Sequence, residues 1–308
     1  MFAYFLRRVL QIIPVLFAVS VITFIMMHLT PGGPWDTVSS RPVSATVKQN
    51  IIKKFGGDKP LVQQYLDYMG GIVLRGDLGP SFKGTQTVNQ IISNGLPISA
   101  AIGLGAITLA LLVGVPLGVL AALKHNTWID QAVMLFVTIG ISVPGFVLAL
   151  ASIVLFSVVL HALPYQFQRE QPLSWIMPVA LLSLGSTALV LRLTRSATLE
   201  VLGEDYVRTA RAKGLGARTV NIRHVLRNAL LPVITLVGIV TANLITGTFV
   251  IESVFAVPGI GRISVQSLFN RDYGVLMGTT LLYTFVVTIA NLLVDLTYSF
   301  IDPRIARA

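Results

Sequence analysis

The sequence predicts an all-α integral membrane protein with six spanning helices. The first observation is composition: 54% of the 308 residues are hydrophobic, 12% are charged, and the mean hydropathy is +0.78. A soluble domain carries about 25% charged residues, so lipid must cover much of this surface. The second observation is six apolar segments, each long enough for the roughly 20 residues of a spanning helix. The third is the uneven distribution of Lys and Arg between the connecting segments.

The six apolar segments set the order of the elements. The first is longer than the apolar core of a signal peptide and has no small-residue cleavage site after it, so we expect a retained helix. The third is long enough to tilt or to break at Pro144. The predicted spans are residues 9–29, 98–123, 131–160, 173–193, 229–255 and 275–300.

Lys and Arg predict the orientation of these spans. With the N-terminus inside, the inside segments hold 13 of the 23 basic residues, and the short outside loops hold three. The other seven lie in the long first outside segment, and long segments count little in this rule. Both termini are therefore expected in the cytoplasm. The predicted organisation is a first segment with its helix (1–29), an extracytoplasmic subdomain (30–97) and a five-helix core (98–308) with a cytoplasmic loop (194–228).

The first outside segment is the largest soluble piece of the chain. It contains the turn signals PGGP, GGDKP and GDLGP, and its pattern predicts an amphipathic helix over residues 47–55. The segment is too short to build a large core of its own. We expect it to lie on the outer mouth of the helical bundle.

Several kinds of chemistry have no motif in this sequence. Cys is absent, and so are the GxxxxGK[ST] phosphate loop, HExxH and GxSxG. The four His residues are scattered, which favours interfacial or hydrogen-bonded side chains over a metal site. We therefore predict no enzyme activity, metal or cofactor in this chain. The net charge of +10, in so apolar a chain, favours membrane lipid or a protein partner over nucleic acid.

Few ionisable groups lie within the apolar segments. Asp295 is interpreted as a structural partner for Arg192 or Arg195 at the same depth, and Glu252 either as a cap at the outer rim or as a group at a substrate gate. An ion-coupled carrier usually needs an acidic group near the bilayer centre, and neither carboxylate is clearly there. The fifth span carries a series of polar side chains that must find partners or line a wet path, namely Thr241, Asn243, Thr246 and Thr248.

The run EDYVRTARAKGLGARTVNIRHVLRNALLP, residues 204–232, predicts a basic helix–turn–helix on the cytoplasmic face. Asp205 suits the positive start of the first helix. Lys213 and then Gly214 are typical of a helix end with its C′ glycine. Ala210 shares a predicted face with Tyr206. Small residues and arginines favour docking into a partner's groove with an acidic rim, and an anionic-lipid patch is the alternative.

This run resembles the cytoplasmic EAA loop of ABC importer permeases. TARAKGL, residues 209–215, is similar to the version in the peptide/nickel branch, and so are LRRVLQIIPVL, HLTPGGP, DLGPSF, VIESVFAVPGIGR, NRDY and IDPR elsewhere in the chain. The likeness spans the whole sequence and is greatest to the first permease of oligopeptide and dipeptide importers. The usual glutamate of the motif falls on Arg208 here, so no glutamate contact is carried over.

The resemblance implies a type I importer permease in the bacterial inner membrane. It implies a second, homologous permease, two ATP-binding subunits that bring ATP and Mg, and a substrate-binding protein that delivers peptide to the outer mouth. It places ATPase coupling on Asp205, Tyr206, Arg208, Ala210, Arg211, Lys213, Gly214 and Leu215. The pathway would include the four polar residues of the fifth span and Glu252. The outer contact would include Val257, Pro258, Gly259 and Arg262.

The sequence leaves other functions open. The same architecture could import nickel chelates, glutathione or another small solute. A secondary carrier would transport as the lone chain, driven by an ion gradient. A membrane-embedded hydrolase would turn over without ATP and would depend on a Ser–His pair, and a scaffold would bind acidic partners through the run from Arg208 to Arg227.

Overall fold

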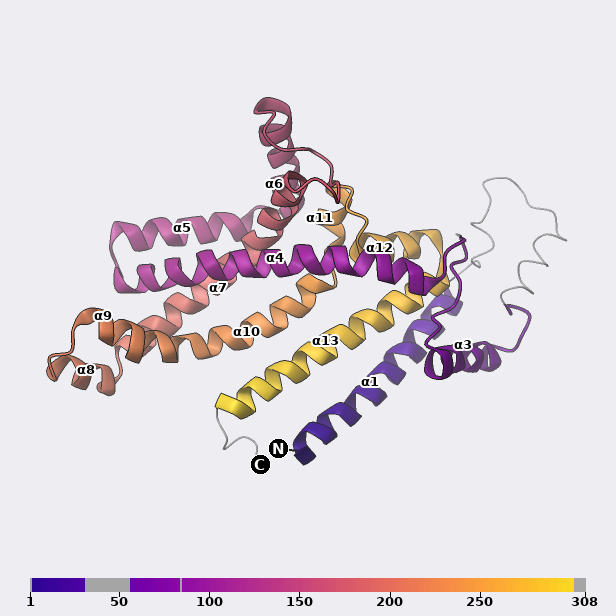
Figure 1. Cartoon of the computed structure of the whole chain (residues 1–308), viewed down its shortest axis with the longest axis horizontal. Coiled ribbons are helices and arrows are strands. Elements are labelled where there is room, and N and C mark those ends of the chain that lie inside the picture. The colour runs from indigo at the N-terminus through magenta and orange to yellow at the C-terminus, as the bar shows by residue number, and fades with distance from the viewer. Residues whose placement is uncertain (1, 31–55, 84, 302–308) are drawn as a thin grey trace. The chain divides into compact units, whose positions relative to one another are not determined.

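Apart from one isolated bridge between Pro80 and Thr87, the described chain consists of helices, turns and loops (Figure 1). The computed structural model describes residues 2–30, 56–83 and 85–301. Five helical spans in this part of the chain are long and apolar enough to cross a membrane, and a bent helix pair makes a sixth. The all-α prediction with six spans is confirmed in this sense. The predicted helix at 47–55 lies outside the described residues.

The spans are built on α1 (Phe2–Leu29), α4 (Val88–Leu123), α5 (Trp128–Ser142) with α6 (Gly145–Ser152), α7 (Leu173–Leu202), α10 (Arg227–Ile245) and α13 (Tyr273–Ile301). Four of the observed helices, α1, α4, α7 and α13, are longer than the apolar segments that predicted them, whereas the third and fifth spans are interrupted.

A capping box explains why α4 begins ten residues before its apolar segment. The backbone N–H of Gln90 donates to Thr87 Oγ1 at 3.3 Å, and the backbone N–H of Thr87 donates to Gln90 Oε1 at 3.0 Å. This reciprocal pair satisfies two N–H groups that the first turn would otherwise leave without partners. The helix can therefore start in a polar stretch.

The third span breaks at Pro144, where the sequence predicted either a tilt or a break. Val143 takes an extended backbone conformation, as the residue before a proline prefers. The axes of α5 and of the helical stretch Gly145–Val159, which ends in the π-helix η2 (Ile153–Val159), differ by 99°. A second break was not predicted: α10 ends at Ile245, Gly247 has φ +83°, and a short α11 (Phe249–Val254) follows.

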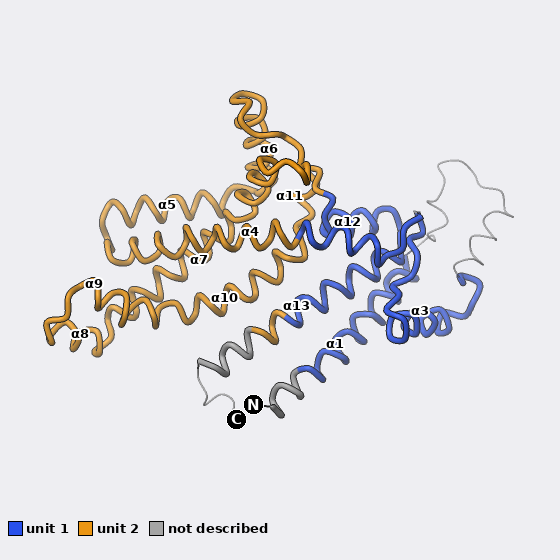
Figure 2. The backbone as a smooth tube through the Cα atoms, viewed as in Figure 1, with its two compact units in different colours: residues 1–99, 258–289 blue, residues 100–257, 290–308 orange. Residues whose placement is uncertain are grey.

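The chain divides into two compact units, which are coloured separately in Figure 2. Unit 1 comprises residues 1–99 and 258–289. It includes two helices that the apolar pattern did not predict, α3 (Leu61–Arg75) and α12 (Ile260–Asn270). Its core is formed by residues of α4, α12 and α13, namely Val88, Ile92, Ile260 and Val275.

Unit 2 comprises residues 100–257 and 290–308. Glycines let α4 approach its neighbours closely. A Cβ on Gly118 would lie 2.7 Å from the carbonyl oxygen of Leu191, and one on Gly114 would lie 3.0 Å from that of Thr187, both in α7. Gly114 and Gly118, four residues apart, thus let α4 approach the backbone of α7. On α10, Leu244 packs with Ala106, Ile107 and Ala110 of α4.

Candidate functional site

The predicted helix–turn–helix is present. α8 (Asp205–Ala212) is followed by a turn over residues 213–216. After the turn, α9 (Ala217–Thr219), the π-helix η3 (Val220–Leu226) and α10 follow one another without a break. Gly214 has φ +76°, its N–H donates to Arg211 O at 3.0 Å, and the N–H of Leu215 donates to Ala210 O at 3.3 Å. These two bonds form a Schellman motif, which satisfies carbonyls at the end of the helix. The predicted stop at Lys213 and Gly214 is confirmed.

One face of α8 is anchored in the chain's own core. Val207 and Ala210, three residues apart on the helix, are buried against Val220 and Val225 of η3. The sequence interpretation placed Ala210 on a face that docks into a partner, and here the structure differs. Ala210 is small because it packs inward, beneath the helix. Ala210 therefore supports the outward face of α8 from beneath.

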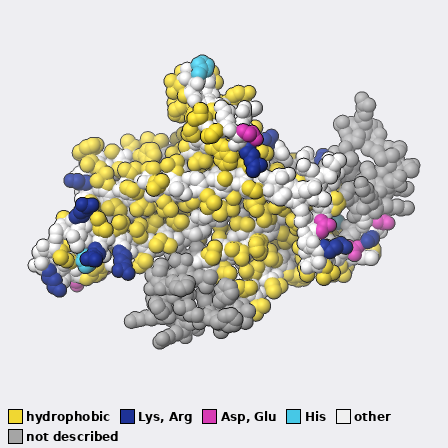
Figure 3. Space-filling model, viewed as in Figure 1, with side chains coloured by type: hydrophobic (Ala, Val, Ile, Leu, Met, Phe, Trp, Pro, Cys, Tyr) yellow, Lys and Arg dark blue, Asp and Glu magenta, His cyan; other side chains and the backbone are white. Residues whose placement is uncertain are grey.

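The outward face of α8 is charged and exposed. Arg208, Arg211 and Lys213 are exposed, and so are Asp205 and Leu215. Figure 3 shows Lys and Arg side chains gathered at the end of unit 2 where α8 and α9 lie, next to a largely apolar surface over α4 and α10. An exposed basic surface on a helix with a fixed end is suited to an acidic partner.

Tyr206 connects this helix to the start of α10. Its hydroxyl accepts a hydrogen bond of 2.8 Å from Asn228 Nδ2. The ring remains half-exposed beside the basic face. This hydrogen bond therefore ties α8 to the first turn of α10.

A buried ion pair fixes the turn between α4 and α5 to α7. Arg195 donates from Nε to Asp130 Oδ1 at 2.6 Å and from Nη2 to Asp130 Oδ2 at 2.7 Å. His125 Nδ1 lies 3.2 Å from the same Oδ2, and the N–H of Asn126 donates to it at 3.1 Å. Sequence reasoning missed Asp130, although an acidic residue in the first turn of a helix near a basic segment was the available signal.

This pair bears on the predicted role of Asp295. The carboxylate that Arg195 binds is Asp130, so Asp295 is not needed to neutralise it. The side chain of Asp295 lies outside the described residues, and its pairing with Arg192 stays a prediction. Arg192 itself is exposed.

Removal of the buried carboxylate should destabilise the chain. We expect Asp130→Ala to cost about 3 kcal/mol, because it leaves the mostly buried guanidinium of Arg195 without its partner. Thermal unfolding of the purified chain in detergent measures this. The double variant Asp130→Ala/Arg195→Met should recover much of the loss, since no uncompensated charge remains. If the double variant lost as much stability as Asp130→Ala and Arg195→Met lose together, the pairing would be contradicted.

The predicted pathway residues do not share one environment. Asn243 is exposed, and Thr241 is half-buried and donates to Val237 O at 2.6 Å. Thr246 is buried and donates to Asn243 O at 3.0 Å. Glu252 in α11 is buried, with 3% of its surface exposed. The structure thus brings Thr246, Thr248 and Glu252 to the break between α10 and α11, and it leaves Asn243 on the outer surface of unit 2.

Thr248 is unusual in this set. Its hydroxyl is buried and has no hydrogen-bond partner among the described residues. A buried hydroxyl without a partner contributes nothing to stability and costs its lost hydration. The place of Thr248 on the pathway stays a prediction.

The isosteric change Thr248→Val separates a role in stability from a role in transport. We expect an unchanged or slightly higher unfolding temperature, by an effect of up to about 1 kcal/mol, because no hydrogen bond is lost. Uptake should fall if the hydroxyl contacts the solute. Thr198→Val is the matched control, because its hydroxyl in α7 is also buried without a described partner. Equal uptake in both variants would remove Thr248 from the predicted pathway.

The four residues predicted as an outer contact are only partly accessible. In unit 2, Val257 is fully buried and its N–H donates to Glu252 O at 2.8 Å. In unit 1, Gly259 is buried at the start of α12, whereas Pro258 is exposed and Arg262 is half-exposed. Pro258 and Arg262 are therefore the members of this set that a partner could reach, and Val257 serves the core.

Comparison with known proteins gives close relatives along the entire chain. The dipeptide transport system permease protein DppB of Bacillus subtilis is 40% identical over 303 residues, which cover 98% of this chain and 97% of the relative. The oligopeptide transport system permease protein OppB of Escherichia coli K12 is 39% identical over 307 residues, 99% of each chain.

Solved structures share the fold. The MetNI methionine ABC transporter in an inward-facing form gives a TM-score of 0.55 at 19% identity, over 69% of this chain and 97% of that one. An amino acid ABC transporter with histidines gives 0.50 at 16% identity, over 68% of this chain and 93% of that one. Residues 1–103 match the N-terminal region of binding-protein-dependent transport system membrane components. Residues 114–307 match the inner membrane component itself, and the chain therefore belongs to the family of binding-protein-dependent transport system inner membrane components.

Proposed function

We propose that the chain is one of two homologous permease subunits of an ATP-driven importer of peptides in the bacterial inner membrane. Relatives that match along their full length are permeases of dipeptide and oligopeptide transport. In this assembly, two ATP-binding subunits hold ATP and Mg, and a substrate-binding protein delivers the peptide. The chain itself performs no catalysis.

The observation that carries the proposal is the construction of α8. Its inner face is fixed by Val207 and Ala210, and its outer face exposes Arg208 and Arg211, which suit an acidic groove on an ATP-binding subunit. A rigid helix on the surface can transfer the movement of an ATPase subunit to α10, which follows it in the chain. Both termini and this loop lie in the cytoplasm under the proposal.

In the transport cycle, ATP binding closes the two ATPase subunits and draws the two α8 helices together. This opens the cavity between the permeases to the outside, and hydrolysis resets it. The polar residues Thr246 and Thr248 and the carboxylate of Glu252 lie at a helix break, where backbone groups can contact a wet path. The outer contact with the binding protein would involve Pro258 and Arg262.

The test is to express the tagged chain together with its genomic neighbours and to identify what co-purifies from gently solubilised membranes. We expect a second six-span permease and two ATP-binding subunits. Reconstitution of this complex with the binding protein should give ATP-dependent peptide uptake. A lone, monodisperse chain that transports with an ion gradient would overturn the proposal in favour of a secondary carrier.

A further inference from the structure

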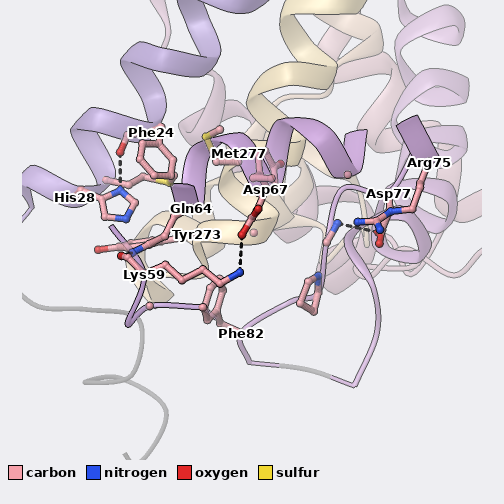
Figure 4. A pocket seen from close by; sticks show the side chains of 18 of the residues that line it. Phe24, His28, Lys59, Gln64, Asp67, Arg75, Asp77, Phe82, Tyr273 and Met277 are labelled. Atoms are coloured by element: carbon pink, nitrogen blue, oxygen red, sulfur yellow. Dashed lines mark hydrogen bonds and ion pairs between the residues drawn. The ribbon is translucent and has the colours of Figure 1, made fainter. Parts of the chain in front are cut away.

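Unit 1 contains a cavity of about 700 Å³ between the end of α1, α3, the start of α13 and the loop after α3. Known ligand sites occupy about 300–1,000 Å³. The cavity belongs to neither the coupling surface nor the predicted pathway. Figure 4 shows the side chains that surround it.

Aromatic rings form one wall of this cavity. The ring of His28 lies 4.2 Å from that of Phe24 and 5.9 Å from that of Tyr273, between centroids, and Tyr273 lies 6.3 Å from Phe82. Nδ1 of His28 lies 2.8 Å from Phe24 O. Since a carbonyl can only accept, Nδ1 carries a proton. Such a wall favours apolar groups with polar atoms attached.

Charges of both signs line the cavity along α3: Lys59 precedes the helix, Asp67 lies in its middle, Arg75 is its last residue, and Asp77 follows it. Lys59 donates to Asp67 Oδ2 at 2.6 Å, which leaves Oδ1 to accept from a ligand. This hydrogen bond to Asp67 raises the pKa of Lys59 above its usual value, so Lys59 stays charged at neutral pH. Toward the other end, Arg75 also lines the cavity and has no ion pair or hydrogen bond among the described residues.

Tyr68 supplies an observation that points to a ligand. It lines the cavity, and its hydroxyl is buried without a hydrogen-bond partner among the described residues. Burial, followed by the negative charge of Asp77, raises the pKa of Tyr68 above its usual range. The phenol is therefore a neutral donor at physiological pH. A buried donor without a protein partner beside a cavity is suited to a ligand oxygen.

The spacing of the charges indicates the length of the ligand. The backbones of Asp67 and Arg75 are eight positions apart on α3, about 12 Å along the axis at 1.5 Å per residue. The guanidinium of Arg75 reaches back beside Gly71, where Nη2 would lie 3.6 Å from an added Cβ, which is about 6 Å along the axis from Asp67. An extended peptide of two to four residues spans about 7–14 Å, so its ammonium and carboxylate groups could reach Asp67 and Arg75.

We propose that this cavity is a receiving site for free peptides of two to four residues, with the ammonium group at Asp67 and the carboxylate at Arg75. The side chains of the peptide lie on the aromatic wall, and Tyr68 donates to a peptide carbonyl. This proposal rests on the proposed peptide cargo and adds a site at which the permease itself holds the solute.

The test uses the full-length chain in phosphatidylcholine nanodiscs and a tetrapeptide that carries benzoylphenylalanine. Irradiation should label α1, α3 or α13, and unlabelled tetra-alanine should compete. Acetylation of the amino terminus or amidation of the carboxyl terminus should weaken binding at least fivefold. Labelling only outside these helices, or equal binding of end-blocked peptides, would overturn the proposal.

Variants assign the two ends. Asp67→Asn should weaken binding of the free-amine peptide about tenfold and leave binding of the acetylated peptide unaffected. Arg75→Gln should weaken binding of the peptide with a free carboxyl end about tenfold and leave binding of the amidated peptide unaffected. Asp58→Asn is the matched control, because Asp58 adjoins Lys59 but does not line the cavity. Tyr68→Phe should weaken binding several-fold without lowering the unfolding temperature. Unchanged binding in all three cavity variants would refute the site.

Two further results are informative. Displacement of the probe by phosphatidylethanolamine, but not by peptide, would show a lipid site and overturn the proposal. ATP-dependent uptake by the assembled transporter is measured separately. Normal peptide uptake without labelling of the cavity contradicts only the receiving site, whereas labelling without ATP-dependent uptake contradicts the proposed function.

Discussion

Replacement of Gly214 by valine should reduce ATP-dependent uptake by about tenfold or more while the chain remains in the membrane. Gly214 has φ +76° at the end of α8. This left-handed conformation costs an ordinary residue about 1–2 kcal/mol and a β-branched residue more, and about 1.4 kcal/mol corresponds to a tenfold change in an equilibrium constant. Valine would unwind the last turn and displace the charged face. Transport assays and co-purification with the ATP-binding subunits measure the effect.

Gly216 provides a matched control two residues later. It is also exposed, and a Cβ at either glycine would meet no atom within 4 Å. Gly216 has φ −60° and ψ 145°, which valine adopts readily, so Gly216→Val should transport normally. Gly214→Asn should retain more activity than Gly214→Val, because asparagine tolerates the left-handed region. Gly214→Asp adds a negative charge at the helix end and should also uncouple transport. Normal uptake by Gly214→Val would refute the role of the cap.

Gly103→Ala should destabilise the chain strongly, although it adds only a single methyl group. A Cβ at this position in α4 would collide with the carbonyl oxygen of Leu244 in α10, with the carbonyl carbon at 2.6 Å and the nitrogen of Ile245 at 2.9 Å. These are backbone atoms and cannot rotate away. Overpacking typically costs about 1–3 kcal/mol, so we expect a clear fall in unfolding temperature and in yield.

Gly185→Ala in α7 is the matched control for this change. A Cβ there meets nothing within 4 Å, and alanine is a better helix former than glycine. Its unfolding temperature should stay the same or rise. If the Gly103 and Gly185 variants unfold at the same temperature, α4 and α10 do not approach as closely as the structure shows.

The lengths of the apolar segments and the local helix-capping signals predicted most of the architecture. The six spans, the break near Pro144 and the end of α8 at Gly214 all follow from features within a few residues of each position. The glycine at a C′ position and the proline in a long apolar run act through their own backbone. Such features can be read without knowledge of the neighbours in space.

The parts that were missed depend on contacts between distant segments. The inward packing of Ala210 requires η3, which follows a turn, and Asp130 pairs with a residue 65 positions away. α3 and α12 are amphipathic rather than wholly apolar, so a search for membrane spans passes over them. The cavity of unit 1 arises from three separate helices, and no local pattern in any one of them predicts it.

The length of α4 has a consequence for the position of the lipid surface. A helix of 36 residues is about 54 Å long at 1.5 Å per residue, whereas the hydrocarbon layer is about 30 Å thick. Even with a tilt, several turns must stand clear of the hydrocarbon. Its first turns carry Asn89, Gln90, Ser93 and Asn94, which suits headgroups and water. The N-terminal turns of α4 therefore form a polar extension of the spanning helix beyond the acyl chains.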